Sequence, residues 1–269
     1  MRKTTILLIA LLVALPAALA VAGPARNAYL CRTDGGGEAM KGKTKIKLLR
    51  DGELHLFSVK IRKADAGDYD VYLVDPDSDV DTWIGEIAVA DGENSGKLKF
   101  NTKRGDEIDA DPVGMRVEVR NGKGDTVLTA MVPDPDAPKV RSNAKSKLEV
   151  PDEEPLDENA KGFVRLKVGN GAHQLQVVAQ KAPAGTYDVM VDDGSGTNDF
   201  EDVGELVVKD GHTSGTWKAN NRRGDPVPSG GDCYTDLAGR AIKIVDGEGA
   251  VLLEGFIPEI EKKKGGPKK

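Results

Sequence analysis

The sequence predicts an all-β protein made of two homologous antiparallel β-sandwich domains in tandem, each about the size of an immunoglobulin-like domain, with a small β-barrel as the alternative. Three observations support this prediction. Apolar and polar residues alternate over short runs, Asp-Gly and Asn-Gly dipeptides separate these runs, and the second half of the chain repeats the first. Beyond residue 22, no segment repeats apolar residues at helical spacing.

The first 22 residues have the three-part plan of a cleavable signal peptide. Two basic residues precede an apolar run over residues 6–15, and Pro16 and two overlapping A-x-A sites follow. We expect cleavage after Ala20 or Ala22, which gives a secreted or periplasmic protein without a membrane span in the mature chain. Removal of residues 1–22 takes away two basic and no acidic residues, and so changes the formal charge from -6 to -8.

The mature chain contains an internal duplication, in which residues 41–133 align with residues 161–258. The order of the matching motifs is the same in both copies, and the second copy has six extra residues that include Cys233. The motifs are A-G-x-Y-D-V at 66–71 and 184–189, D-G-x-x-S-G at 91–96 and 210–215, and K-x-N-x-x-R-G-D at 99–106 and 218–225.

The duplication and the composition of the segments around it define the expected domain boundaries. Prolines and charged residues between the copies predict a flexible linker, because such a stretch buries little apolar surface. The expected segments are an N-terminal segment at 23–40, repeat 1 at 41–133, the linker at 134–160, repeat 2 at 161–259 and a Lys-rich disordered tail at 260–269.

Alternation within the repeats predicts which side chains form the two cores. Tyr69 and Val71 alternate with polar neighbours, as do Tyr187 and Val189 at the equivalent positions of the second copy. This period of two places one face of a strand on a core and the other in water. We therefore expect these four side chains to be buried at matching places.

The motifs resemble those of repeat modules in uncharacterised secreted bacterial tandem β-repeat proteins. The resemblance lies in G-x-Y-x-V at 67–71 and 185–189, the G-E pair that opens the next strand, and G-x-G-x-x-x-L at 122–128. These are mostly turn and core positions. The resemblance therefore implies the fold and export, and it transfers no catalytic residue.

The composition excludes several classes of function. A negatively charged chain is a poor general binder of nucleic acid, which is held by a basic face. Three His and two Cys leave little material for a zinc or haem site, and neither G-x-S-x-G nor H-E-x-x-H is present. We interpret His55, His173 and His212 as strand or loop side chains in water, and we expect no enzymatic activity.

One acidic run is a candidate calcium site. Asp75, Asp77, Asp79 and Asp81 alternate along a tight loop, and Glu86 follows at the spacing of the last ligand in a calcium loop. However, Val80 stands where such a loop needs Gly, and strands rather than helices flank the run. We therefore prefer an acidic, solvated hairpin tip, with calcium binding as the alternative.

The tripeptide Arg-Gly-Asp occurs at 104–106 and again at 223–225. Integrins recognise this tripeptide when it is exposed at a turn. Because the two copies descend from one duplication, their agreement is not independent support for adhesion. A structural Gly-Asp turn explains both.

Cys31 and Cys233 are the only thiols in a chain that is predicted to enter an oxidising compartment. An intramolecular disulfide would connect the N-terminal segment to the second repeat. Two free thiols and an intermolecular dimer are the alternatives that the sequence leaves open.

Together these observations predict a non-catalytic exported structural or interaction module built from two β repeats. The alternative is a protein that binds calcium or a small ligand weakly through its acidic hairpin loops. The sequence implies no other cofactor, and the class of partner it suggests is an envelope or extracellular protein.

Overall fold

The structure is a computed structural model, and it describes residues 22–33, 39–49, 51–78, 80–137, 141–153, 155–169, 171–197, 199–227, 231 and 233–260. Over these residues the protein is all-β, with sixteen strands, two short 3-10 helices and no α-helix. Neither of those helices is long and apolar enough to cross a membrane. The predicted signal peptide, apart from Ala22, and residues 261–269 of the predicted tail lie outside the described residues.

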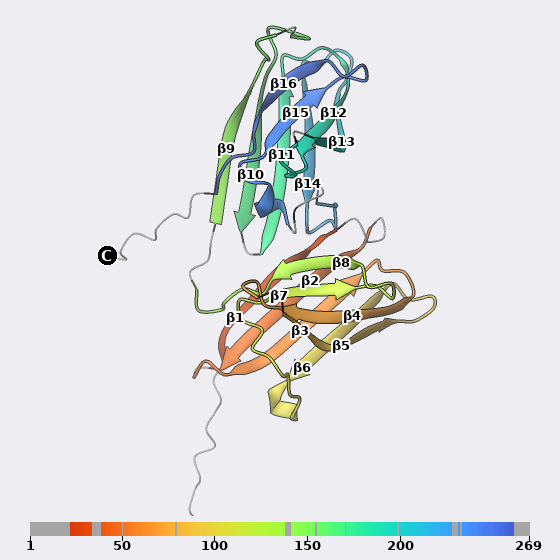
Figure 1. The fold of residues 1–269 in the computed structure, drawn as a ribbon, viewed down its shortest axis with the longest axis vertical. Coiled ribbons are helices and arrows are strands. Elements are labelled where there is room, and N and C mark those ends of the chain that lie inside the picture. Colours follow the sequence, from red (N-terminus) through yellow and green to blue (C-terminus); the bar gives the residue numbers. More distant parts are fainter. Residues whose placement is uncertain are drawn as a thin grey trace, which may run out of the picture.

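The first repeat forms one eight-stranded antiparallel sheet (Figure 1). Its elements are β1 (Ala22–Arg32), β2 (Lys41–Leu49), β3 (Leu54–Arg62), β4 (Gly67–Val74), β5 (Asp81–Val89), β6 (Ser95–Asn101), η1 (Thr102–Arg104), β7 (Arg116–Arg120) and β8 (Thr126–Met131). The strand order is β5-β4-β7-β8-β1-β2-β3-β6. The edge strands β5 and β6 approach each other, so the sheet curls around one core and is nearly barrel-shaped.

The second repeat has the same topology. Its elements are β9 (Arg141–Glu149), β10 (Lys161–Gly169), β11 (Ala172–Gln180), β12 (Gly185–Asp192), β13 (Phe200–Val208), β14 (Ser214–Asn220), η2 (Tyr234–Leu237), β15 (Ala241–Val245) and β16 (Val251–Phe256). The order β13-β12-β15-β16-β9-β10-β11-β14 is the first order advanced by eight strands. The duplication inferred from the sequence is therefore a duplication of the fold.

Equivalent residues occupy equivalent places in the two sheets. Val71 and Val189 are both fully buried, and each is followed by a register shift in the pairing with the next strand. Tyr69 and Tyr187 are also buried, and each hydroxyl donates a hydrogen bond of 3.0 Å to the carbonyl four residues earlier. The period of two thus assigned these four side chains to the cores correctly.

The structure corrects two of the expected boundaries. Residues 134–160 contain β9, which pairs with β10 and β16, and residues 23–40 contain most of β1, which pairs with β2 and β8. Strand β9 is polar in sequence, and only its Leu148 is buried. A strand can be held by main-chain hydrogen bonds while most of its side chains meet solvent, so composition alone suggested a linker.

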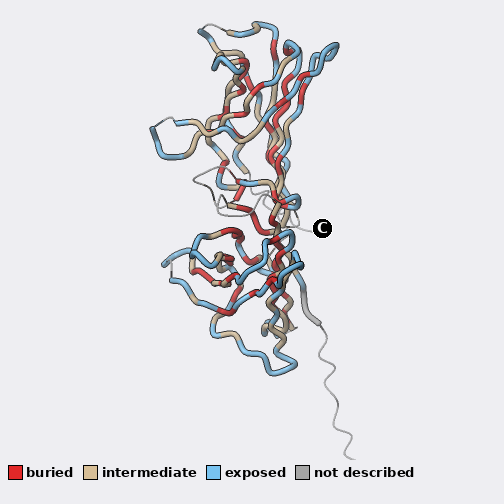
Figure 2. The backbone as a smooth tube through the Cα atoms, turned by 90° about the vertical axis from the view of Figure 1, so that its right-hand side faces the viewer, coloured by how far each residue is buried: buried red, intermediate tan, exposed pale blue. Residues whose placement is uncertain are grey.

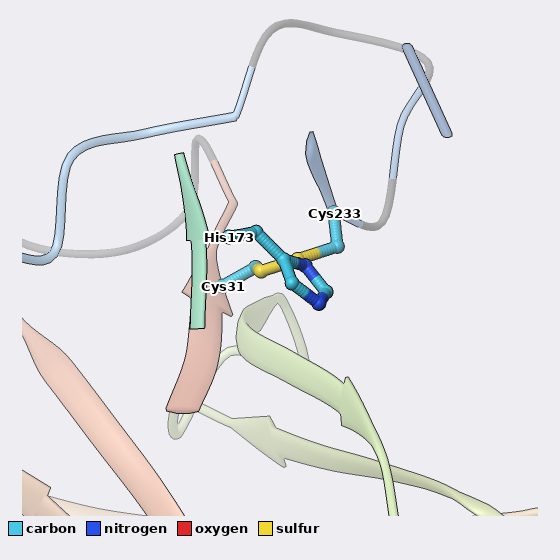
Figure 3. Close-up of side chains that lie close together, drawn as sticks. All are labelled: Cys31, His173 and Cys233. Carbon is cyan, nitrogen blue, oxygen red and sulfur yellow. A yellow bond between two sulfur atoms is a disulfide. The ribbon is translucent and has the colours of Figure 1, made fainter. Parts of the chain in front are cut away.

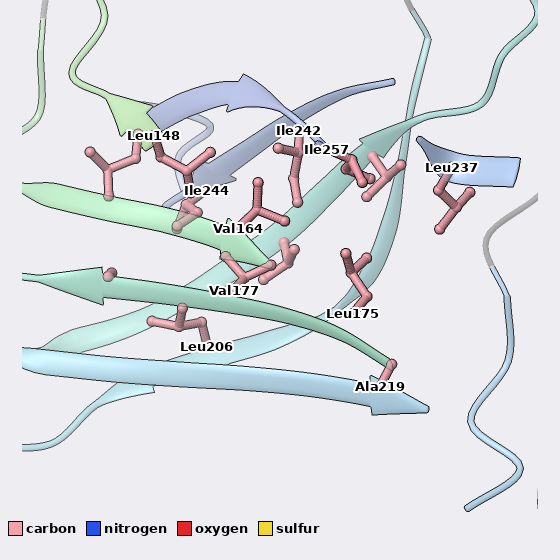
Figure 4. Close-up of a cluster of buried hydrophobic side chains, with 14 of the residues drawn as sticks. Leu148, Val164, Leu175, Val177, Leu206, Ala219, Leu237, Ile242, Ile244 and Ile257 are labelled. Carbon is pink, nitrogen blue, oxygen red and sulfur yellow. The ribbon is translucent and has the colours of Figure 1, made fainter. Parts of the chain in front are cut away.

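Each repeat has its own hydrophobic core, drawn for the second repeat in Figure 4. Figure 2 shows buried residues along both sheets and also where the repeats meet. One residue belongs to the core of the other repeat: Cys31, from β1, lies in the cluster formed by β9–β16. The two repeats are therefore packed against each other around this cysteine.

Candidate functional site

The acidic hairpin does not form a cluster of ligands in the part of the chain that is described. Asp75 accepts hydrogen bonds from the Asp77 amide at 2.9 Å and the Ser78 hydroxyl at 2.8 Å, which lowers the pKa of its carboxyl group. Asp81 instead pairs with Arg120 at 2.6 Å. Glu86 lies further along β5, opposite Asp70. Asp79 lies outside the described residues.

We expect calcium at about 1 mM, the range of extracellular calcium modules, to leave the thermal unfolding midpoint unchanged. A ligand that binds only the folded state raises that midpoint by mass action, and the carboxylates of Asp75 and Asp81 already have partners, in their own turn and in Arg120. Differential scanning calorimetry with and without calcium checks this. A rise that is abolished by Asp77→Ala with Asp79→Ala would restore the calcium alternative.

The two Arg-Gly-Asp turns have a structural explanation. Asp106 accepts a hydrogen bond of 2.8 Å from the Asn101 amide, and Asp225 accepts the same bond, also at 2.8 Å, from Asn220. The glycine between Arg and Asp has a positive φ in both copies, +83° at Gly105 and +80° at Gly224. The turn itself accounts for the tripeptide.

The structure contains an intramolecular disulfide between Cys31 and Cys233, with Cα atoms 5.4 Å apart (Figure 3). Cys31 lies near the end of β1 and is fully buried, and Cys233 precedes η2 and is 8% exposed. The bond links residues 202 positions apart and joins the first repeat to the second. Of the three alternatives left open by the sequence, this is the one that the structure contains.

The insertion unique to the second repeat positions Cys233. Tyr234 is fully buried, and its hydroxyl donates to the carbonyls of Asp225 and Pro226 at 3.0 and 2.9 Å. Burial raises the pKa of this hydroxyl, so it acts as a neutral donor. The Asp236 carboxylate accepts a hydrogen bond of 2.7 Å from the Cys233 amide. These contacts hold the second sulfur beside β1.

We call the contact between the two repeats around the Cys31–Cys233 disulfide the joint. Main-chain hydrogen bonds also connect the two repeats on both sides of Cys31. The Tyr29 amide donates to the Gly171 carbonyl at 2.9 Å, and the Val227 amide donates to the Arg32 carbonyl, also at 2.9 Å. Arg32 and Pro226 form a parallel bridge. The end of β1 therefore pairs with the second repeat as well as with its own sheet.

Asn221 is the buried polar residue at the centre of the joint. Its side chain has no exposed surface, and its Nδ2 donates to the Tyr29 carbonyl at 3.0 Å. Its Oδ1 accepts a hydrogen bond of 2.9 Å from the His173 amide. One side chain thus satisfies main-chain groups of both repeats.

Replacing Asn221 with Ala should lower the free energy of unfolding by about 1–3 kcal/mol, because the buried groups that it pairs would lose their partners. Asn94→Ala is the matched control, since Asn94 is exposed in the loop just before β6, and it should change stability by less than about 0.5 kcal/mol. Urea denaturation followed by circular dichroism measures both. Equal effects would contradict the role assigned to Asn221.

Two turn glycines of the second repeat contact the main chain of the first. Gly171 has a φ of +68°, and a Cβ there would collide with the backbone of Asn27 and Ala28. Gly224 has a φ of +80°, and a Cβ there would collide with the Met40 carbonyl. Gly52 and Gly105, in the corresponding turns of the first repeat, have similar φ values and open space around them.

This difference gives a controlled test of the joint. All four Gly→Ala variants carry left-handed strain of about 1–2 kcal/mol. Gly171→Ala and Gly224→Ala should be destabilised by at least about 1 kcal/mol more than Gly52→Ala and Gly105→Ala, because the new methyl group meets fixed backbone. Chemical denaturation of the four variants checks this, and four equal losses would mean that the repeats do not pack as described.

His173 completes the site, and here the expectation of a solvated histidine is wrong. It lies on β11, and its Nδ1 is 2.9 Å from Cys233 Sγ. Burial lowers the pKa of its imidazole, and Asp236 opposes that shift. Cys31, His173 and Cys233 are the only group of three metal-ligand side chains within the described residues, with their ligand atoms all within 4.8 Å of one another.

A cavity of about 680 Å³ opens beside this group, between the two repeats. Residues of both repeats line it, including Tyr29, Thr129, His173 and Cys233. Its volume lies in the range of small-molecule sites, which is about 300–1,000 Å³. His173 and Cys233 therefore both border a space that lies between the two repeats.

No family model matches the chain, and no curated protein is significantly similar to it. The site is therefore interpreted from its own geometry. That geometry describes a joint between two repeats, closed by a disulfide, by main-chain hydrogen bonds and by Asn221.

Sequence reasoning identified the two cysteines and missed the other residues of the joint. His173 carries no motif, because its neighbours in the site come from β1 and from the insertion, both distant in sequence. Asn221 and Gly171 lie in turns that resemble their counterparts in the first repeat. The one available signal was that both cysteines fall at places where the copies differ.

Proposed function

We propose that the protein is a non-catalytic exported structural or interaction module in which a covalent joint fixes the orientation of two β repeats. The observation that carries this proposal is the Cys31–Cys233 disulfide, which crosses from one repeat to the other. Disulfides persist in oxidising compartments, which agrees with the signal peptide expected over residues 1–22. A fixed pair of repeats presents one continuous surface to a partner.

The two cysteines of the joint are not part of the duplicated sequence. Leu30 pairs with Gly42, and Leu148 pairs with the equivalent Gly162, so Glu149 is the counterpart of Cys31. Cys233 lies in the insertion, which the first repeat lacks. Each cysteine is therefore absent from the other copy. The link between them belongs to the two-repeat protein and not to the single repeat.

For each repeat we favour a description as a β-sandwich of two four-stranded halves. The pairing that joins the halves is short: β1 meets β8 at two residue pairs, and β16 meets β9 at two. The approach of β5 to β6 on the opposite side supports the alternative, a small barrel. Both descriptions place the joint at the end of β1.

Capture of partners from the native cell envelope tests the proposed function. Wild-type protein and the Cys31→Ser, Cys233→Ser double variant are used as paired baits. We expect a partner that the wild type retains and the variant binds more weakly, while circular dichroism shows both baits to be folded. A catalytic turnover found in a hydrolase screen, or native protein that still carries Met1–Ala20 by mass spectrometry, would contradict the proposal.

A further inference from the structure

The joint between the repeats contains a set of atoms that a disulfide alone does not need. A histidine nitrogen approaches one sulfur of the bond at 2.9 Å, and the two sulfurs and this nitrogen come from three separate segments. Figure 3 shows the His173 ring lying alongside the Cys31–Cys233 bond. Sulfur and imidazole nitrogen are the ligands preferred by zinc and related borderline metal ions.

We propose that Cys31, Cys233 and His173 form a metal site for a divalent ion of the zinc class when the disulfide is reduced. A dithiol reductant supplies two electrons and two protons: its own two thiols become a disulfide, and the Cys31–Cys233 bond breaks to give two thiols. The metal ion then displaces both thiol protons and bonds to two thiolates and one imidazole nitrogen. The disulfide and the metal ion are thus alternative links between Cys31 and Cys233.

The distances suit this exchange. Zinc bonds of about 2.3 Å to sulfur and 2.0–2.1 Å to nitrogen place tetrahedral ligand atoms about 3.5–3.8 Å apart. The three ligand atoms already lie within 4.8 Å of one another, and the Cα atoms of the two cysteines are 5.4 Å apart. After reduction the sulfurs need only to move apart by rotation of their side chains, with the main chain in place.

The surroundings hold the ligands and leave one position open. The Asn221 side chain accepts a hydrogen bond from the main-chain N–H of His173. The Nδ2 of Asn221 lies 3.5 Å from Cys31 Sγ, where this donor would stabilise a thiolate. His173 and Cys233 also line the cavity of about 680 Å³. Three protein ligands with a fourth position toward a cavity is the arrangement that admits water or a small ligand to a zinc-class ion.

Cobalt(II) is the probe for this site, because thiolate ligation gives it charge-transfer absorption in the near ultraviolet. The full chain is reduced under argon with a phosphine, two thiols are counted by Ellman's reagent, and cobalt(II) is added after the reductant is removed. We expect one equivalent to bind with a thiolate band, zinc(II) to displace it, and the oxidised protein to show no band. The Cys31→Ser, Cys233→Ser variant should lose the band.

Histidine variants separate the proposed site from a simple pair of thiols. His173→Ala should weaken cobalt(II) binding by at least about tenfold, since loss of even an outer partner costs 10–100-fold. His173→Asn, which retains a polar atom near the position of Nδ1, serves as a second variant if the alanine protein does not fold. His212→Ala is the control, because His212 is exposed in a distant turn, and it should bind as the wild type does.

Four results would overturn the proposal. They are a disulfide that cannot be reduced without loss of the circular dichroism spectrum, the absence of a thiolate band in the reduced protein, equal binding by the oxidised form, and unchanged affinity in folded His173 variants. Each concerns the metal site alone, so the proposed role as a two-repeat module does not depend on them.

Discussion

Replacing both Cys31 and Cys233 with serine should lower the free energy of unfolding by roughly 5 kcal/mol. The reason is the length of the loop that the disulfide closes, since the two residues are 202 positions apart. In the chain-entropy model the cross-link restricts the unfolded chain more as the loop grows, and a loop of about 100 residues already contributes about 4.7 kcal/mol. Urea denaturation of the oxidised wild type and the double variant measures the difference.

Two comparisons make this result specific to the bond. Reduced wild-type protein should lose about as much stability as the double serine variant, because both lack the same cross-link. A Ser→Ala change at Ser214, which is exposed at the start of β14, is a suitable control for the substitution itself and should have little effect. A loss of less than about 1 kcal/mol, well below the 2–5 kcal/mol typical of native disulfides, would show that the bond does not stabilise the protein by restricting the unfolded chain.

Val189→Asp should destabilise the protein by roughly 3–5 kcal/mol, the range found when a buried charge is left without a partner. Val189 is fully buried in the core of the second repeat. Val207→Asp is the matched control, because Val207 lies on the neighbouring strand β13 and is 46% exposed. It should cost less than about 1 kcal/mol. Thermal and urea unfolding report both values.

The equivalent change in the first repeat tests the coupling between the cores. Val71 is also fully buried, so Val71→Asp should have a comparable cost. Cys31 belongs to the second core and the joint is covalent, so each variant should unfold in one transition. Tryptophan fluorescence follows this unfolding, because Trp83 lies in the first repeat and Trp217 lies in the second. A variant in which one tryptophan reports unfolding well before the other would show independent repeats.

The parts of the fold that depend on the pattern of apolar and turn residues were predictable from the sequence. The alternation around Val71 and Val189 and the repeated turn motifs gave the strands, the cores and the duplication. The prediction of a flexible linker was wrong, because a strand in that segment is held by main-chain hydrogen bonds. Strand β9 carries mostly exposed polar side chains, and its place in the sheet depends on hydrogen bonds that leave no mark on composition.

The candidate site was predictable only in its covalent part. With two thiols in the chain, one intramolecular pairing was possible, and the structure contains it. His173 and Asn221 could not be found in the same way, because their roles come from the docking of one repeat on the other. Gly171 likewise has the sequence of an ordinary hairpin turn, and only its closeness to Asn27 and Ala28 distinguishes it from Gly52.

We propose that the joint holds the two repeats in one fixed orientation, which residual dipolar couplings of the backbone amides can measure. The couplings are measured on the oxidised, isotope-labelled protein in a weakly aligning medium and fitted to the structure of each repeat. We predict that one alignment tensor fits the residues of both repeats. Two tensors of different magnitude or orientation would contradict the claim, because they would mean that the repeats are oriented differently or move independently.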